Sequence, residues 1–196
     1  MRNNYDLLYF MGDSFTHGND EGTNLINENN RFSGLISKHY NIPNVNNAVP
    51  GCSNMTIMQQ TFTDILEFLN KGKKVLAIIC DTQYDRLELY CQKNKRPMTI
   101  SPNFSFFKDY MLECYSQDYN KKLTKNLYIA MESFFYKNKV DYVMASISEY
   151  DSYFTSDNWF KTNLCTVAQE DGRFYGNMHF NVLGHQRVAN ELIKKK

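Results

Sequence analysis

Two uninterrupted apolar runs constrain the fold of this chain more than any other feature of its sequence. Residues 75–80 (VLAIIC) and 142–147 (YVMASI) are short and lack the polar alternation of a half-buried strand. Such runs are typical of strands that are covered on both faces, as in a parallel sheet with helices above and below it. We therefore place both segments at the centre of a parallel sheet.

Weaker strand and helix signals alternate along the rest of the chain. Residues 7–11 (LLYFM) predict a strand that ends at Gly12, residues 44–49 predict another, and residues 164–167 are a candidate for a fifth. The predicted helices are residues 32–40, residues 55–69 behind the N-cap candidate Asn54, residues 123–136 and residues 181–193. This alternation predicts an α/β fold with a parallel sheet of about five strands and helices on both faces.

The length of 196 residues fits a single domain, residues 1–196, with enough apolar material for a full core. The sequence contains no internal repeat, low-complexity tract or Pro/Gly/Ser-rich linker. Residues 82–116 are too long for a routine connection between two elements and are rich in aromatic side chains. We expect them to form a long loop insertion that is a lid or a partner surface.

Composition excludes several classes of function. The formal net charge of +1, from 22 Lys and Arg against 21 Asp and Glu, argues against a nucleic-acid partner. The longest apolar run is residues 75–80, whereas spanning a bilayer takes about 20 residues, so no membrane partner is expected. From the polar start MRNNYD we expect no signal peptide, and five scattered cysteines predict neither disulfides nor a zinc site. We expect a soluble protein of a reducing compartment such as the cytoplasm. An oligomer or a larger assembly is compatible with the sequence.

The first candidate site follows the first predicted strand. Ser14 stands on a glycine-flanked turn, Gly12-Asp13-Ser14, directly after residues 7–11. In open α/β sheets, ligands bind beyond the carboxyl ends of the strands. Ser14 is therefore the best nucleophile candidate, and the alternative is a turn in which Asp13 and Ser14 only satisfy backbone donors.

The second candidate site follows residues 44–49. Gly51 lets a backbone N–H approach a ligand closely, and Asn54 adds a side-chain amide nearby. Two donors that converge on one point can form an oxyanion hole. The alternative is a turn followed by a helix N-cap. Ser53 lies inside this turn and is a rival nucleophile.

The third candidate site precedes the predicted C-terminal helix. His179 stands where an imidazole could reach across to Ser14 and act as its base. His185 lies six residues later, inside the helix, where we expect a packed or capping side chain. His17 and His39 have the same structural interpretation, and His17 is a reserve candidate because it follows Ser14 closely.

Together these blocks resemble the SGNH (GDSL-type) esterase and lipase family over nearly the whole chain, from Gly12 to Ala189. Ser14 matches the serine of the first block, Gly51 the glycine of the second and His179 the histidine of the last. The last block reads HFNVLGH, which follows the usual H-P-N-x-x-G-H course with Phe in place of Pro. The α/β-hydrolase signature G-x-S-x-G is absent around Ser14, which disfavours that competing fold.

The resemblance implies a flavodoxin-like three-layer sandwich and acyl transfer without metal or cofactor. Ser14 would be the nucleophile and His179 its base, and the N–H groups of Ser14 and Gly51, with the amide of Asn54, would hold the oxyanion. The substrate class that it makes plausible is a small acyl ester of the acetyl type, such as an O-acetyl group on a carbohydrate, so the partner would be a small-molecule or glycan ester.

The third block of the family is the first departure. The family has G-x-N-D after its third strand and uses the asparagine in the oxyanion hole, whereas this chain reads CDTQYDR over residues 80–86. Asn54, Thr82 or Gln83 could replace that asparagine. We expect Arg86 and Glu88 to form a structural ion pair at the rim.

The acid of the triad is the second departure, because its family position, three residues before His179, is Gly176. A backbone carbonyl or another carboxylate would then orient His179, and the carboxylate candidates are Glu149, Asp151, Glu170 and Asp171. The Thr-x-x-x-Arg-x-Glu third block looks like that of phage-type variants, which adds a virion to the expected settings. The alternative to an esterase is a catalytically silent SGNH-fold module that binds glycan or is a structural part of a virion.

Overall fold

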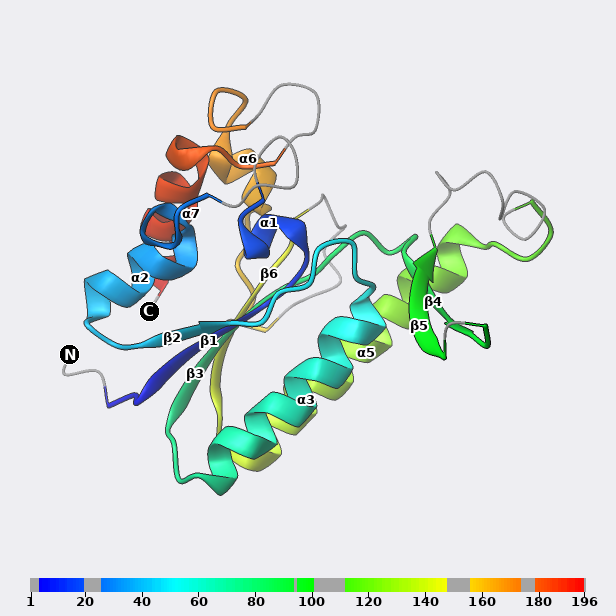
Figure 1. Ribbon diagram of the computed structural model, residues 1–196, viewed down its shortest axis with the longest axis horizontal. Coiled ribbons are helices and arrows are strands. Elements are labelled where there is room, and N and C mark those ends of the chain that lie inside the picture. Colours follow the sequence, from blue (N-terminus) through cyan, green and yellow to red (C-terminus); the bar gives the residue numbers. More distant parts are fainter. Residues whose placement is uncertain are drawn as a thin grey trace.

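The central sheet of the protein, seen in a computed structural model, is parallel and has four strands among the residues that the structure describes. The structure describes residues 4–19, 26–93, 95–100, 112–147, 156–173 and 179–195. The strands are β1 (Leu7–Met11), β2 (Asn44–Asn46), β3 (Val75–Cys80) and β6 (Asp141–Ala145), in the order β2-β1-β3-β6 (Figure 1). The expected α/β fold with a parallel sheet is therefore confirmed, and all residues of β1 and β3 are buried.

The register places the ends of the inner strands side by side. Met11, the last residue of β1, lies opposite Ile79 of β3, and Cys80, the last residue of β3, lies opposite Ala145 of β6. Because the strands are parallel, the chain leaves each of them at the same edge of the sheet. The segments that follow Met11, Cys80 and Ala145 are thus brought together.

Helices cover the two faces of the sheet and make the three-layer sandwich (Figure 1). Helices α2 (Phe32–Tyr40), α6 (Leu164–Ala168) and α7 (Val182–Lys195) pack on one face, and α3 (Asn54–Asn70) and α5 (Gln117–Asn138) pack on the other. The alternation of side chains along β1 divides the core accordingly. Leu8 and Phe10 join the α2–α7 side, whereas Leu7, Tyr9 and Met11 join the α3–α5 side.

Part of the predicted insertion at residues 82–116 is a β-hairpin. Strands β4 (Leu87–Cys91) and β5 (Arg96–Ile100) pair antiparallel, with Leu87 opposite Ile100, and lie beside the start of α5 at the right of Figure 1. The rest of the insertion, residues 101–111, lies outside the described residues. A lid or a partner surface therefore remains a prediction for this segment.

The predicted strand at residues 164–167 is wrong, because these residues form α6. The Asn163 side chain caps this helix by accepting a hydrogen bond from Thr166 N at 2.7 Å, and Leu164 and Ala168, four residues apart, are buried against the α7 side of the core. Beside β6, the structure has an isolated parallel β-bridge between Met144 and Trp159 in place of a fifth strand. A short apolar run thus formed one helical turn once its neighbours offered a cap and a core.

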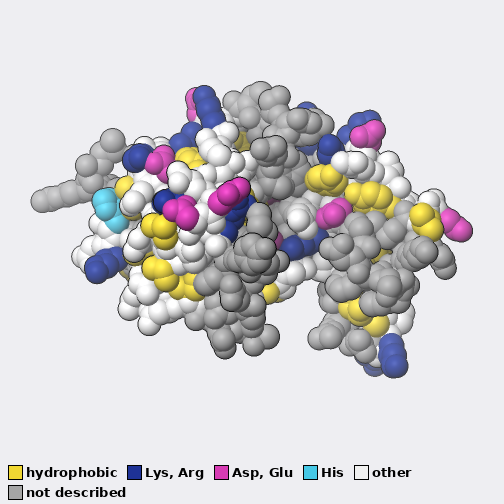
Figure 2. Space-filling model, turned by 90° about the horizontal axis from the view of Figure 1, so that it is seen from above, with side chains coloured by type: hydrophobic (Ala, Val, Ile, Leu, Met, Phe, Trp, Pro, Cys, Tyr) yellow, Lys and Arg dark blue, Asp and Glu magenta, His cyan; other side chains and the backbone are white. Residues whose placement is uncertain are grey.

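Two further short helices are α1 (Ser14–His17) and the 3-10 helix η1 (Glu28–Asn30). Within the described part of the chain, no helix is long and apolar enough to cross a membrane. On the face shown in Figure 2, basic and acidic side chains of the described residues are interspersed. That face carries no stripe of a single charge sign among the described residues, in keeping with the formal net charge of +1.

Candidate active site

Ser14 is the first residue of α1, three residues beyond the end of β1. Gly12 makes this turn possible, because a Cβ at that position would lie 2.3 Å from Thr16 Oγ1. Asp13 is the N-cap of α1, and its Oδ1 accepts a hydrogen bond from Phe15 N at 3.0 Å. The turn therefore presents Ser14 at the carboxyl edge of the sheet, as the sequence predicts.

The structure brings His179 to Ser14. His179 Nε2 lies 2.8 Å from Ser14 Oγ, a hydrogen bond between residues 165 positions apart. The ring of Phe15 packs against both His179, with centroids 4.9 Å apart, and Phe180, with centroids 5.1 Å apart. The imidazole is thus held by aromatic packing at the distance from which a base can take the hydroxyl proton.

Residues on either side of His179 contact one another: Asp171 and Gly172 precede it, and Asn181 and Gly184 follow it. Asn181 N donates to Gly172 O at 2.9 Å, and Asn181 Nδ2 donates to Asp171 O at 2.8 Å. Gly172 and Gly184 touch so closely that a Cβ on Gly184 would lie 2.0 Å from Gly172 O. The position of His179 therefore depends on a contact between two glycines, one seven residues before it and one five residues after it.

None of the proposed acids is seen on the His179 ring among the described residues. Asp171 faces Arg187, with oxygen-to-nitrogen distances of 2.5 and 3.1 Å, and its side chain is 65% exposed. The hydrogen bond from Arg187 lowers the pKa of Asp171. Glu170 is exposed. The other three positions of that prediction, Gly176, Glu149 and Asp151, lie outside the described residues.

Gly51 lies in the loop after β2, beside the Ser14 turn. Val49 N donates to Gly12 O at 2.9 Å, and the Cys52 thiol donates to the same oxygen at 3.4 Å. Gly51 has a φ of +72°, which favours glycine, and its N–H makes no hydrogen bond to any residue that the structure describes. The same holds for the N–H of Ser14 at the start of α1. Both groups are donors that a ligand could use.

Asn54, the third predicted oxyanion donor, is buried and already hydrogen-bonded. Its side chain is buried and is hydrogen-bonded to the backbone of Thr82, from Nδ2 to Thr82 O at 3.0 Å and from Thr82 N to Oδ1 at 2.9 Å. The hydroxyl of Tyr128 also donates to Oδ1, at 2.9 Å. Asn54 thus joins α3 to the chain that leaves β3, and only one amide proton remains for another acceptor.

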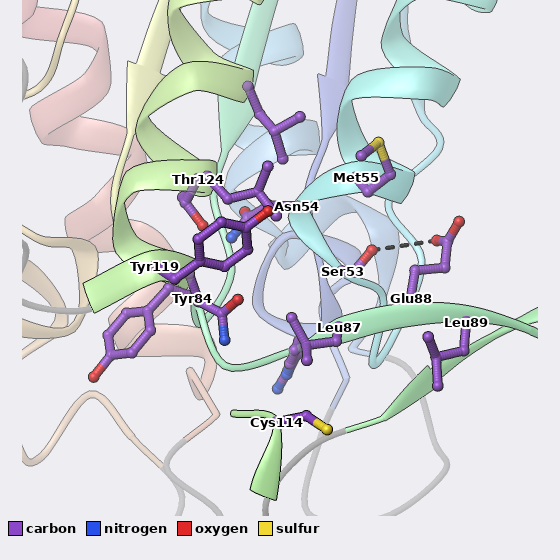
Figure 3. Close-up of a pocket in the computed structure, with 14 residues that line it drawn as sticks. Ser53, Asn54, Met55, Tyr84, Leu87, Glu88, Leu89, Cys114, Tyr119 and Thr124 are labelled. Carbon is purple, nitrogen blue, oxygen red and sulfur yellow. Dashed lines mark hydrogen bonds between the residues drawn. The ribbon is translucent and has the colours of Figure 1, made fainter. Parts of the chain in front are cut away.

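The N-cap of α3 is Ser53, which corrects the prediction of Asn54. Ser53 Oγ donates to Glu88 Oε2 at 3.2 Å (Figure 3). It accepts from Thr56 N at 3.1 Å, and the Thr56 hydroxyl donates to the same carboxylate. The rival nucleophile is therefore engaged as a helix cap. The Glu88 carboxylate accepts hydrogen bonds from these two hydroxyl groups and is not paired with Arg86, so the expected ion pair between Arg86 and Glu88 is wrong.

Arg86 pairs with Asp13 instead. Arg86 Nη1 lies 2.8 Å from Asp13 Oδ2 and 2.8 Å from Thr82 Oγ1, and the Thr82 hydroxyl donates to Asp13 Oδ2 at 2.8 Å. The neighbouring Asp81 is also buried and accepts hydrogen bonds from Ser146 Oγ and Ile147 N at 3.0 and 2.9 Å. Burial raises the pKa of both carboxyl groups. Sequence reasoning missed the Asp13 contact, for which the Thr82-x-x-x-Arg86 spacing was the available signal.

The other three histidines have the structural surroundings that the sequence predicts. His185 is fully buried on α7 between the rings of Phe32 and Phe180. His17 Nδ1 lies 2.7 Å from Asn19 Oδ1, and His39 is exposed and packs on Tyr40. Among the described residues no group of three or more His, Cys, Asp or Glu side chains could hold a metal ion.

A pocket of about 240 Å³ lies between the start of α3, strand β4 and the start of α5 (Figure 3). Ser53, Glu88, Tyr84 and Tyr119 line it, with Leu87 on the hairpin side. Arg86 also lines this pocket while its Nη1 contacts Asp13, the residue before Ser14. The pocket is thus separated from the Ser14 turn by one buried ion pair.

Solved structures similar to this chain define its fold. A protein assigned to the G-D-S-L lipolytic family from Desulfitobacterium hafniense DCB-2 matches with a TM-score of 0.61 and 14% identity, over 97% of this chain and 99% of that one. The psychrotrophic esterase EstA from Pseudoalteromonas sp. matches with a TM-score of 0.57 and 12% identity, over 97% and 96%. The acetyl xylan esterase Est2A from the rumen bacterium Butyrivibrio proteoclasticus matches with a TM-score of 0.63 and 11% identity, over 96% of this chain and 62% of that one.

The fold is therefore that of the SGNH (GDSL-type) hydrolases, as the resemblance of the sequence implied. No protein-family model matches the sequence, and no curated protein matches it either.

Proposed function

We propose that the protein is a serine ester hydrolase that acts through an acyl-enzyme on Ser14. The observation that carries the proposal is the 2.8 Å hydrogen bond between Ser14 Oγ and His179 Nε2 at the carboxyl edge of the sheet. A hydroxyl that is hydrogen-bonded to an imidazole is the arrangement that activates serine as a nucleophile. The fold shared with GDSL-type esterases supports the same chemistry.

In the proposed reaction, His179 Nε2 takes the Ser14 proton while Ser14 Oγ forms a bond to the ester carbonyl carbon. The carbonyl oxygen becomes an oxyanion, and its collapse breaks the bond to the alcohol oxygen, which leaves with the proton from His179. Water then gives a proton to His179 and attacks the acyl group. The second collapse releases the carboxylic acid and returns the proton to Ser14.

The N–H groups of Ser14 and Gly51 are the proposed oxyanion donors. Both lie at the carboxyl edge of the sheet, and neither is used by another described residue. Asn54 is the third proposed donor, through the amide proton that it does not give to Thr82 O. Each well-placed donor of this kind is worth about 10²–10³ in rate.

A short acyl ester of the acetyl type is the proposed substrate, and an acetylated carbohydrate is the case to test first. The solved structures similar to this chain include an acetyl xylan esterase with a TM-score of 0.63. A second one, AlAXEase, is also an acetyl xylan esterase and matches with a TM-score of 0.53.

The test combines turnover with covalent labelling. Purified protein is assayed with p-nitrophenyl acetate and acetylated xylan, and a fluorophosphonate probe is mapped by mass spectrometry. We expect the label on Ser14, no label in Ser14→Ala, and a loss of at least about 10³-fold in turnover in His179→Ala. The matched control is Ser53→Ala, which should keep the label on Ser14.

Labelling at Ser53 or at a cysteine, with Ser14→Ala fully reactive, contradicts the assignment. A protein that neither turns over esters nor reacts with the probe supports the alternative, a catalytically silent SGNH-fold module that binds glycan or is a structural part of a virion. The missing third-block asparagine is the observation that favours this alternative.

A further inference from the structure

The carboxylate of Asp13 is buried directly beneath the Ser14 turn. Asp13 is 1% exposed, and its two oxygens accept hydrogen bonds from three donors: Phe15 N, Thr82 Oγ1 and Arg86 Nη1. Two of these donors are 69 and 73 residues away along the chain. The turn is therefore tied through one side chain to the segment that leaves β3.

Arg86 supplies the positive charge that this burial requires. A carboxylate removed from water is costly unless it is paired and hydrogen-bonded. Burial raises the pKa of Asp13, and the charge of Arg86 is the largest influence in the opposite direction. The charge of His179, before α7, also lowers the pKa of Asp13. In turn, burial and the negative charge of Asp13 raise the pKa values of the titratable groups around it, which are Asp81, Cys52, Cys80 and Cys165.

Asp13 determines where Ser14 lies. It is the N-cap of α1, which has only four residues, so the turn cannot be stable through its own hydrogen bonds. Its side chain fixes Phe15 N, and the ring of Phe15 packs on His179. A displacement of Asp13 would move both members of the Ser14–His179 hydrogen bond relative to one another.

The same segment also holds the Gly51 loop. The backbone of Thr82 is bonded in both directions to the Asn54 side chain, and Glu88 accepts from Ser53 at the N-cap of α3. Gly51 lies two residues before that cap. Residues 82–88 thus connect the Ser14 turn to the loop that carries the second proposed oxyanion donor.

We propose that Thr82 and Arg86 are positioning residues of the esterase reaction, which hold Ser14 against His179 by clamping the buried Asp13 carboxylate. This inference rests on the proposed function, and it gives the unusual third block a role in place of the missing asparagine. Neither side chain needs to touch the substrate for this role.

The experiment measures ester hydrolysis from pH 5 to pH 9 in the wild type, Arg86→Met, Arg86→Lys and Thr82→Val. In Arg86→Met we expect kcat to fall about tenfold or more with a smaller change in KM, and a further decline toward acid pH as the unpaired Asp13 takes up a proton. Arg86→Lys should restore most of the rate. Thr82→Val, which loses one donor only, should have an intermediate kcat. Lys71→Met, at an exposed ion pair with Glu67 at the C-terminal end of α3, is the charge-matched control and should keep the wild-type rate.

The Asp13→Asn background isolates the clamp. An amide cannot titrate, so Arg86→Met should cost much less in Asp13→Asn than in the wild type, and the additional acid decline should disappear. Equal losses in the two backgrounds would overturn the inference, because Arg86 would then act independently of Asp13. An unchanged kcat and pH profile in Arg86→Met would overturn it as well.

Hydrogen–deuterium exchange of the peptide around Ser14 gives a readout that needs no turnover. We expect the amide of Phe15 to exchange about tenfold faster in Arg86→Met than in the wild type, with Arg86→Lys between them. Unchanged exchange would contradict the clamp even in an active enzyme. Faster exchange in a protein without esterase activity would contradict the proposed function alone.

Discussion

His185 should make the stability of this protein sensitive to acid. Its ring is fully buried on α7, and Nδ1 accepts a hydrogen bond from Phe32 N at 3.3 Å, so the ring is neutral with its proton on Nε2. Burial lowers the pKa of His185 to about 3, and the positive charge of Arg31 acts in the same direction. The perturbation that tests this is His185→Phe, which keeps an aromatic ring and removes the titration.

The expected magnitude follows from the two pKa values. In the unfolded chain the imidazole titrates near the reference value of about 6.5, so the unfolded state binds the proton first as the pH falls. Stability is therefore fully present above pH 6.5 and is lost as the pH falls toward 3. At about 1.36 kcal/mol per pKa unit, the loss is about 2 kcal/mol at pH 5 and roughly 5 kcal/mol below pH 3.

The assay is urea unfolding of the wild type and His185→Phe at pH 7.5 and pH 5.0. We expect the wild type to lose about 2 kcal/mol more than the variant between these two pH values. The buried carboxyl groups of Asp13 and Asp81, whose pKa values are raised by burial, stabilise the folded state toward acid pH, but they are present in both proteins and cancel in the difference. His39→Phe, at an exposed position, should keep the wild-type dependence. A His185→Phe variant with the full wild-type pH dependence would refute the reasoning.

Two further predictions concern the segment that carries His179. Gly184→Ala would place a Cβ 2.0 Å from Gly172 O, so the free energy of unfolding measured in urea should fall by about 1–3 kcal/mol; an unchanged value would show that the two glycines do not need to touch. Asp171→Asn removes only an exposed ion pair with Arg187, which solvent screens, so ester hydrolysis at neutral pH should fall less than about tenfold. A loss of about a thousandfold in a folded Asp171→Asn protein would instead make Asp171 the third member of a triad.

The sheet could be predicted from the sequence because its strands are buried on both faces. Apolar runs such as residues 75–80 are visible without knowledge of their neighbours, and the structure has β3 at those bounds. The short helix α6 could not be predicted in this way, since its five residues, four of them apolar, fit a strand equally well. Its identity depends on the Asn163 cap and on the contact with α7, which are properties of the assembled fold.

The candidate site could be predicted as far as its motifs extend. The turn at Ser14 and the histidine at 179 each follow a local pattern, and their contact follows from the parallel topology. The partners of Asp13 could not be predicted from the sequence, because the chain contains many cationic side chains that could pair with a carboxylate. Only the fold brings Arg86 next to Asp13. The alternation of charges along residues 82–88 indicated an ion pair but assigned it to the wrong acid.

The separation of Ser14 and His179 along the chain has a consequence for the newly synthesised protein. At about 5–20 residues per second, the 165 residues between them take roughly 8–33 s to make, whereas Arg86 follows Asp13 within roughly 4–15 s. Arg86 can therefore pair with Asp13 and hold the serine turn as soon as β1 and β3 have paired, before His179 has been synthesised. During synthesis the serine turn is thus in place before the site is complete, and any chain that stops before residue 179 carries a positioned serine without the imidazole that would activate it.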